Sequence, residues 1–498
     1  DHWENHTDAY FDPILSHNGV DKQYSGYCTD IFFTEAMKWI GTQHRKKKPF
    51  FVYLPTNTPH VPDICADKYS KPYEGLHEGK PVPAKFYGMI ANLDENLGRL
   101  ETFLKEEGLR ENTLLIYMSD NGTQSTRAKD MFNAGMRDKK TSVYEGGHRV
   151  PLFVRWPGGA LSHGQDVDAL TQVQDLLPTF IDLCGLKNES ADGFNGLSLA
   201  GLMKGTATEL PDRKLVVQYR TSGGPWDPAV VMWNKWRLLK PKKGRRPQPP
   251  NAALELYHVG RDPGQSKNVA ADHPDVLEAM KTHYETWHAE AKQLFDRTRW
   301  IRIGSTAANP MILYAQDWAG DYCDNPGGLS AATAHGSWKV DVDRAGVYEI
   351  ELRRWPKEAD KSLTEGWAKG PGGTARNARP IAAANLSIAG KNYTLDTMSG
   401  DTHAAFRVEL PAGKTQLSTL FLNADDRSLC SAIYVYLRRL DDGAGAKLTP
   451  VSDRMSKGRV PAGRKRKPVK PKPEKKKAAT AVAQPNIVLI FIDDMGYG

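Results

Sequence analysis

Short apolar runs that end abruptly in polar residues are the strongest pattern along the chain. Such runs, bounded by turn residues, are typical of buried strands in a parallel sheet. In open α/β sheets the functional groups lie at the carboxyl ends of the strands. We therefore predict that the polar residues after these runs share one site. The runs, each with the polar residues that follow it, are 50–54 with His60, 113–118 with Asp120 and Asn121, and 486–492 with Asp493 and Asp494.

Apolar residues spaced by three and four predict amphipathic helices between and after these strands. The predicted helices are 30–40, 86–107, 173–184 and 274–292, and one further strand is predicted over 150–156. Strands that alternate with helices indicate an α/β domain whose sheet is flanked by helices.

The pattern changes near residue 214, where short strands follow one another closely. Four of them predict a small antiparallel subdomain, and evenly spaced alternating strands after residue 310 predict a β-sandwich. Four tryptophans of that region raise the alternative of a sugar-stacking face, although packing in a core is the favoured role. These tryptophans are Trp318, Trp338, Trp355 and Trp367. The predicted domains are 1–213, 214–309 and 310–440, followed by a linker over 441–484 and a separate strand region over 485–498.

Length and charge narrow the class of protein. The 498 residues are too many for one compact core and predict two or more domains. The net charge of +8 comes from residues 449–480, which hold twelve Lys or Arg and two Asp or Glu. That segment has no interleaved aromatics, so a solvated linker is favoured over binding to nucleic acid or another anionic polymer. No apolar run reaches the roughly eighteen residues that span a bilayer.

Cysteine spacing and the first residues add two expectations. The five cysteines form no Cys-x-x-Cys pair, which argues against a zinc knuckle or a thioredoxin motif. The chain begins without Met and without a signal peptide, so we expect its natural start to lie upstream.

The polar residues after the three strands suggest chemistry on an anionic ester. Asp120, Asn121, Asp493 and Asp494 offer three carboxylates and an amide oxygen, which suit Ca²⁺ or Mg²⁺ better than zinc. Lys140 is a candidate point charge for an anionic oxygen, although a solvated loop charge is the commoner role. His60 is a candidate to bind the anion or to protonate a leaving alkoxide, or it is a surface residue. Together these groups indicate hydrolysis of a sulfate or phosphate ester.

Seven longer motifs carry a family resemblance. They are GYCTDIFFTEAM (26–37), TPHVP (58–62), LLIYMSDNG (114–122), KTSVYEGGHRVPLFVRWPG (140–158), DLLPTFIDLCG (175–185), ELYHVGRDPGQSKNVA (255–270) and IFIDDMGYG (490–498). With them, residues 1–300 and 485–498 resemble the sulfatase family. The resemblance implies the alkaline-phosphatase-like α/β fold, which has a mixed sheet with flanking helices. It also implies a sulfuric ester hydrolase for sulfated carbohydrates or aryl sulfates, located in the periplasm or outside the cell.

The resemblance also implies roles for individual residues. Asp120 and Asn121, with Asp493 and Asp494, resemble the calcium ligands of the family. Lys140 and His60 resemble its sulfate-binding Lys and His, and residues 145–149 resemble the structural support behind the site.

Two departures from the family pattern matter for activity. The Asp-Asp strand opens a sulfatase domain, but here it lies at the end of the chain. The Cys/Ser-x-Pro-x-Arg motif, whose Cys or Ser becomes the formylglycine nucleophile, is not found. We therefore expect a piece of a tandem protein that is inactive by itself. We also predict that strand 486–492 docks in cis beside the central strand and completes the acidic cluster.

Two alternatives stay open on the sequence. One is a phosphodiesterase or phosphonate hydrolase of the same superfamily. The other is a non-catalytic carbohydrate-binding protein that uses residues 310–440.

Overall fold

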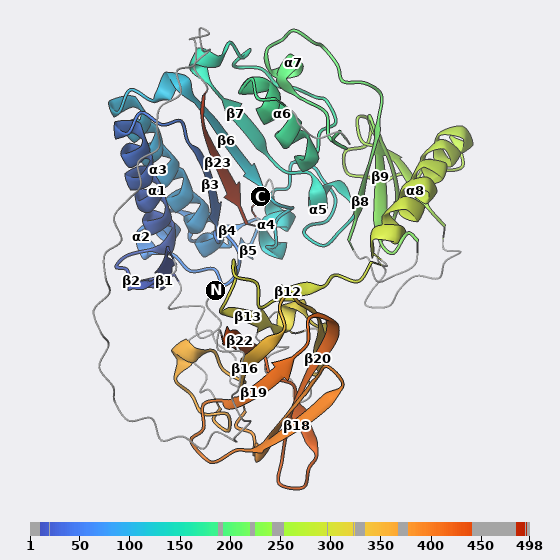
Figure 1. The fold of residues 1–498 in the computed structure, drawn as a ribbon. Helices are drawn as coiled ribbons and strands as arrows, with labels where there is room; N and C mark the ends of the chain where they lie inside the picture. Colours follow the sequence, from blue (N-terminus) through green and yellow to red (C-terminus); the bar gives the residue numbers. More distant parts are fainter. Residues whose placement is uncertain are drawn as a thin grey trace, which may run out of the picture. The chain divides into compact units, whose positions relative to one another are not determined.

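The computed structural model describes residues 10–18, 20–187, 193–219, 225–241, 253–295, 297–321, 323, 334–366, 377–440, 485–493 and 495. The chain divides into two compact units (Figure 1). The α/β unit comprises Asp8–Asp296 with Lys477–Gly498, and the sandwich unit comprises Arg297–Lys476 with Asp1–Thr7. The last strand of the chain therefore belongs to the first unit.

A four-stranded sheet forms the centre of the α/β unit. Its strands are β3 (Phe51–Thr56), β23 (Asn486–Ile492), β6 (Thr113–Ser119) and β7 (Leu152–Arg155), in that order. The first three strands are parallel, whereas β7 is antiparallel to β6. Strand 486–492 thus docks in cis beside the central strand, as predicted, and the mixed α/β fold class is confirmed.

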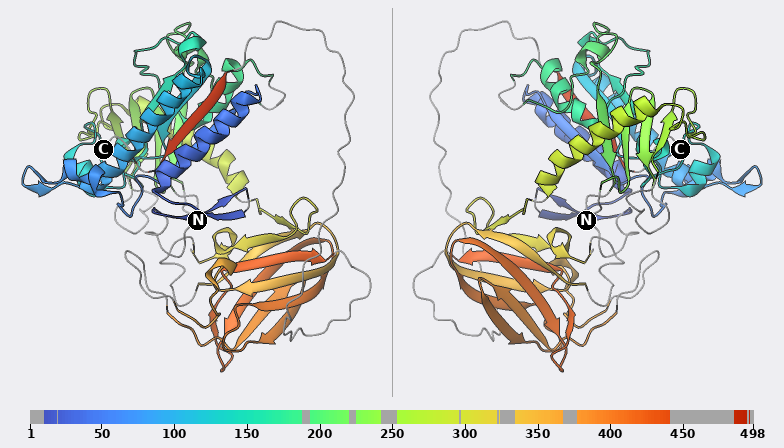
Figure 2. Two further views of the ribbon diagram at one scale, coloured as in Figure 1. Left: turned by 90° about the vertical axis from the view of Figure 1, so that its left-hand side faces the viewer. Right: turned by 90° about the vertical axis from the view of Figure 1, so that its right-hand side faces the viewer.

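The alternation of apolar side chains along β23 explains why it occupies the middle of the sheet. Val488, Ile490 and Ile492 pack into a core with residues of α1 (Cys28–Arg45) and α3 (Ala84–Glu106). Ile487 and Leu489 point to the opposite face, towards α6 (Leu176–Leu183) and α7 (Ala200–Met203). Both faces of β23 are therefore covered, as a continuous apolar run requires. Figures 1 and 2 show β23 in red beside the helices.

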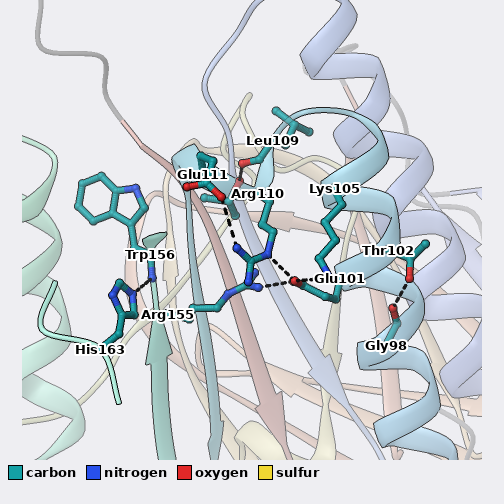
Figure 3. Close-up of polar contacts among 11 residues, drawn as sticks. Gly98, Glu101, Thr102, Lys105, Leu109, Arg110, Glu111, Arg155, Trp156 and His163 are labelled. Carbon is teal, nitrogen blue, oxygen red and sulfur yellow. Dashed lines mark hydrogen bonds and ion pairs between the residues drawn. The ribbon is translucent and has the colours of Figure 1, made fainter. Parts of the chain in front are cut away.

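An ionic cluster ties the outer strand of the sheet to α3 (Figure 3). Arg155, at the end of β7, forms an ion pair with Glu101 of α3. Arg110, from the 3₁₀ turn η2 (Arg110–Asn112), donates to the other oxygen of Glu101 at 2.5 Å. Lys105 lies 3.4 Å from the same carboxylate. These contacts hold β7, and through it β6, against the helical layer.

Shorter elements complete the α/β unit. They are β1 (Ile14–His17), β2 (Val20–Gln23), α2 (Asp67–Ser70), η1 (Lys71–Tyr73), β4 (Leu76–His77), β5 (Lys80–Pro81), α4 (Thr126–Met131), α5 (Glu145–His148), η3 (Pro157–Gly159) and η4 (Val173–Asp175).

A second, antiparallel sheet extends the α/β unit. Its order is β11 (Glu255–His258), β10 (Trp236–Lys240), β9 (Ala229–Trp233) and β8 (Lys214–Gln218). Helix α8 (Pro274–Phe295) packs on this sheet through Met280 and Tyr284, which are fully buried. The helix begins at Pro274, and proline suits this first position because a backbone N–H there would have no partner within the helix.

The sandwich unit consists of two sheets around one core. One sheet follows the order β12 (Ile301–Ile303), β15 (Gly336–Val342), β20 (Gly413–Leu422), β17 (Ala383–Ile388) and β18 (Lys391–Asp396), with β14 (Ala319–Gly320) and β21 (Ser428–Cys430) at its sides. The other follows β13 (Met311–Tyr314), β22 (Tyr434–Leu440), β16 (Gly346–Arg353) and β19 (Ala404–Leu410). The turns η5 (Ala315–Asp317) and η6 (Lys357–Ala359) complete it.

The tryptophans of the sandwich unit lie inside. Trp318, Trp338 and Trp355 are buried, and the indole of Trp338 donates to the Tyr314 carbonyl at 2.8 Å. These three side chains therefore pack rather than form an exposed sugar-stacking face, and Trp367 lies outside the described residues. Strand β12 precedes residue 310 but pairs with β15, so this strand is part of the sandwich.

In the part of the chain that the structure describes, no helix is both long and apolar enough to cross a membrane.

Truncation of β23 tests its place in the core. Ile490 is 0% exposed, so Ile490→Ala is expected to lower the free energy of unfolding of the α/β unit by about 2–5 kcal/mol. Equilibrium unfolding in urea measures the change, with the sandwich unit as an internal reference. The control Ile14→Ala, at a side chain 58% exposed, should change stability by less than about 0.5 kcal/mol. Equal effects of the two substitutions would contradict the burial of β23.

Candidate functional site

The carboxyl ends of β23 and β6 meet, and this brings two of the predicted acids together. The register aligns Ile492 with Ser119, so Asp493 and Asp120 are the next residues on neighbouring strands. The Asp120 N–H donates to the Ile492 carbonyl at 3.1 Å, and the Ser119 hydroxyl donates to the same oxygen at 3.2 Å. Two hydrogen bonds therefore hold together the ends of β6 and β23, next to which the two aspartates lie.

The loop after β6 is fixed by close backbone packing. The Asn121 N–H donates to Asp120 Oδ1 at 2.6 Å, and its side-chain nitrogen donates to the Gly122 carbonyl at 3.2 Å. A Cβ atom on Gly122 would lie 1.8 Å from the Gly146 carbonyl oxygen, so only glycine fits between this loop and α5. The Gly122 N–H also donates to the Gly147 carbonyl at 3.1 Å. Helix α5 thus supports the Asp-Asn-Gly loop from behind.

Lys140 lies on the loop that runs beside the Asp-Asn-Gly turn. Its N–H donates to the Thr123 carbonyl at 3.1 Å, which joins the two loops. Lys140, Asp120 and Asn121 line one cleft of about 1340 Å³. The structure therefore brings these three predicted site residues to one surface.

His60 lies after β3, on a loop held by several hydrogen bonds. Its Nδ1 contacts the Val61 carbonyl at 2.7 Å, and its N–H donates to the Asn57 carbonyl at 3.1 Å. The Tyr10 hydroxyl donates to the His60 carbonyl at 2.9 Å. His60 is not among the residues that line the cleft containing Lys140. It follows a strand adjacent to β23, at the same end of the sheet.

Tyr10 and Cys28 are site neighbours that sequence reasoning missed. Burial raises the pKa of Tyr10, and the nearby Cys28, Asp493 and Asp63 raise it further. Tyr10 therefore lies within electrostatic reach of the end of β23 while it holds the His60 loop. No motif near residue 10 signals this contact, because fifty residues separate the hydroxyl from its acceptor.

The Cys28 thiol is buried and poorly suited to act as a nucleophile. It contacts Asn57 Oδ1 at 3.4 Å. Burial raises the pKa of Cys28 to about 11, although hydrogen bonds to Thr29 and Asn57 oppose the shift. Because the thiolate is the reactive form, this cysteine is inert at neutral pH.

A buried ion pair stabilises α5 behind the site. Glu145 is 1% exposed, and Arg237 Nε donates to it at 2.6 Å. Burial alone would raise the pKa of Glu145, but Arg237 and the nearby His148 and Arg149 outweigh burial and lower it. Burial, the largest influence, lowers the pKa of His148, although the neighbouring Glu145 opposes this shift.

The donor set suits a hard cation. Asp120, Asn121 and Asp493 offer oxygen atoms, which Ca²⁺ prefers. Within the described residues, no three His, Cys, Asp or Glu side chains gather closely enough to hold a metal ion. Asp494, the fourth predicted ligand, lies outside the described residues. Asn121 is a further oxygen donor, of a residue type that the four named above do not include.

Comparison with known proteins identifies part of the chain. The sulfatase family model matches residues 2–186. The chain is similar to N-acetylgalactosamine-6-sulfatase of Mus musculus, with 24% identity over 321 residues, which cover 60% of this chain and 58% of that protein. It is 27% identical to N-acetylgalactosamine-6-O-sulfatase of Bacteroides thetaiotaomicron, with 52% and 50% covered. It is 26% identical to arylsulfatase A of Homo sapiens, with 53% and 52% covered.

Similar solved structures include the crystal structure of Ps i-CgsB, with 26% identity, a TM-score of 0.49 and 55% and 58% of the two chains covered. The phosphonate monoester hydrolase of Agrobacterium radiobacter is 19% identical, with a TM-score of 0.41 and 56% and 66% covered.

These matches define residues 2–186 as a segment of the sulfatase family. The chain spans about half the length of the curated relatives it matches.

The buried pair of Glu145 and Arg237 gives a pH-dependent prediction. Glu145→Gln is expected to lower the free energy of unfolding by about 3–5 kcal/mol at pH 7, because it leaves Arg237 buried without its charge partner. A lowered pKa in the folded state stabilises the protein above the unfolded-state pKa, near 4.5, and this contribution is lost as the pH falls through the folded-state value.

Urea unfolding of wild type and variant, from pH 7 to pH 3, measures this effect. The difference between them should shrink below pH 4.5. Glu278→Gln, at an exposed surface pair on α8, is the matched control and should change little at any pH. A difference that stays constant across the whole range would rule out the ion pair as its cause.

Proposed function

We propose that the α/β unit forms part of a sulfuric ester hydrolase that acts on sulfated carbohydrates. One observation carries the proposal: Asp120 and Asp493 follow hydrogen-bonded neighbouring strands within a unit that contains sulfatase-family sequence. The substrate class is supported by two similar proteins, which are named as sulfatases of N-acetylgalactosamine 6-sulfate esters.

In this proposal Asp120, Asn121 and Asp493, with Asp494, hold a divalent metal, for which Ca²⁺ is favoured over Mg²⁺. Ca²⁺ accepts six to eight oxygen ligands in flexible geometry, whereas Mg²⁺ demands a near-ideal octahedron. A bound divalent cation would polarise an ester oxygen. The carboxylates of the strand ends supply the negative charge that holds such a cation, and the hydrogen bonds to Ile492 keep them adjacent.

Lys140 and His60 take complementary roles towards the ester. The Lys140 ammonium neutralises an anionic oxygen of the substrate as a point charge. The contact of His60 Nδ1 with the Val61 carbonyl requires a proton on Nδ1, since a carbonyl only accepts. The other ring nitrogen, Nε2, is the one proposed to pass a proton to the leaving alkoxide.

The chain by itself is proposed to lack the reacting group. None of the five cysteines lies in a Cys-x-Pro-x-Arg motif, and the buried Cys28 thiol keeps its proton at neutral pH. The formylglycine nucleophile expected of a complete enzyme therefore has no precursor within these residues.

Calcium titration tests the proposed metal ligands. Isothermal calorimetry of the wild-type chain with CaCl₂ is expected to show one site, which MgCl₂ fills more weakly. Asp120→Asn and Asp493→Asn should each weaken binding by about tenfold or more, since removing even an outer-shell partner costs 10–100-fold. Asp130→Asn, on the exposed face of α4, should bind as wild type does. Unchanged affinity in both site variants would refute the assignment.

Aryl sulfate and aryl phosphate assays test the proposed inactivity of the isolated chain. No turnover of an aryl sulfate is expected, because no nucleophile is present. Hydrolysis that His60→Ala abolishes would contradict this expectation. Turnover of a bis-aryl phosphate diester, without turnover of the aryl sulfate, would favour the phosphodiesterase alternative.

A further inference from the structure

The middle strand of the α/β unit comes from a distant part of the chain. Its residues pair on one side with β3, from Ile487 opposite Phe51 to Ile492 opposite Thr56. On the other side they pair with β6, from Asn486 opposite Thr113 to Ile492 opposite Ser119. The space between β3 and β6, here called the slot, is therefore one strand wide.

Each wall of the slot also has contacts that do not involve β23. On one wall, Val52 and Leu54 of β3 belong to the core to which α1 and α3 contribute. On the other wall, β6 pairs with β7, which the Arg155–Glu101 ion pair ties to α3. The Thr113 hydroxyl also donates to the Leu109 carbonyl at 2.8 Å. Both walls thus belong to the surrounding unit, and β23 completes the sheet between them.

Contacts at both ends of the slot fix the register of the strand. At its start, the Phe50 N–H donates to Asn486 Oδ1 at 3.3 Å, and the Ile487 N–H donates to the Phe50 carbonyl at 2.9 Å. At its end, the Met495 N–H donates to the Ser119 hydroxyl at 3.2 Å. Each of these contacts joins residues 486–495 to the residues that border the slot. The register of the strand is therefore set by these neighbours alone.

The connection to the rest of the chain is long. Between Leu440, the last residue of β22, and Pro485 lie 44 residues outside the described part of the chain. A segment of that length can reach up to about 145 Å when fully extended. A strand on such a tether can reach the slot of its own chain or that of a neighbouring molecule.

We propose that β23 is an exchangeable strand, so that the slot also accepts residues 486–492 from a second copy of this chain. A strand from the second copy makes the same contacts as the chain's own strand, because each contact described above joins the strand to the slot. Reciprocal exchange closes a two-fold dimer. Each candidate site then combines Asp120 and Asn121 of one copy with Asp493 of the other.

Concentration decides which arrangement forms. A tether raises the effective concentration of its own strand at the slot, so dilute chains fill their own slots. Removing a seated strand breaks both ladders, so folded chains exchange slowly. Exchange is therefore expected when chains refold together at high concentration. This inference does not depend on the proposed hydrolase activity, and its test uses no substrate.

Complementation between two full-length variants tests the proposal. One chain carries Val488→Asp and Ile490→Asp, which place charges at positions 1% and 0% exposed and disable its strand. The other carries Ile116→Asp in β6, at a position 1% exposed, which disables its slot but leaves its strand intact. The strand-disabled chain is labelled with ¹⁵N, and the two chains carry different tags.

The chains are refolded together from denaturant. The readouts are co-purification through the tag of the slot-disabled chain and protection of Cys28, which is 0% exposed, against a thiol reagent. The isotope label assigns the protected Cys28 to the strand-disabled chain. Both readouts are expected to rise about fivefold or more over a control in which the slot-disabled chain also carries Val488→Asp and Ile490→Asp. Recovery equal to that control would overturn the proposal.

A second measurement uses wild-type chains for its main comparison. Two differently tagged wild-type chains are refolded together at low and at high concentration and separated by size. A mixed dimer is expected only at high concentration, and folded chains mixed afterwards should not form it. The absence of mixed dimer at every concentration would overturn exchange. So would a mixed dimer that persists when both chains carry Val488→Asp and Ile490→Asp, since it would then form through another surface.

Discussion

Insertion of β23 between β3 and β6 is the contact on which the α/β unit depends. Without this strand the sheet would lose two parallel ladders. The helices on each face of the sheet would also lose the β23 side chains against which they pack. The same insertion positions the candidate site, because Asp493 reaches the neighbourhood of Asp120 only when Ile492 is seated against Ser119. The strand that completes the sheet therefore also completes the candidate site.

A second layer of interactions keeps the site rigid. The Asp-Asn-Gly loop rests on the glycines of α5, and α5 rests on the buried pair of Glu145 and Arg237. Buried charges of this kind are costly unless they are paired. Their position directly behind the loop suggests that they orient the loop and not the substrate. The Tyr10 hydroxyl supports the His60 loop in a similar way, through its hydrogen bond to the His60 carbonyl.

The sequence could predict those parts of the structure that follow from a local hydrophobic period or from the polar residues at the end of an apolar run. The apolar runs before Asp120, His60 and Asp493 predicted three parallel strands, because a buried strand must be apolar on both faces. Docking of strand 486–492 beside the central strand β6 was also predicted, whereas its second pairing, with β3, was not. Contacts across long separations could not be predicted, and Tyr10 with His60 and Glu145 with Arg237 are examples. Neither pair has a spacing signal, since only the completed fold brings its members together.

Residues 486–492 form the middle strand of the α/β sheet, and the rest of this unit depends on that placement. Hydrogen–deuterium exchange on the dilute monomer, read by mass spectrometry, tests it most directly, because amides in a paired and buried strand exchange only when the unit opens. Peptides covering 487–492 are expected to be protected as strongly as those covering β6. Complete exchange of residues 487–492 within seconds, while β6 stays protected, would contradict it.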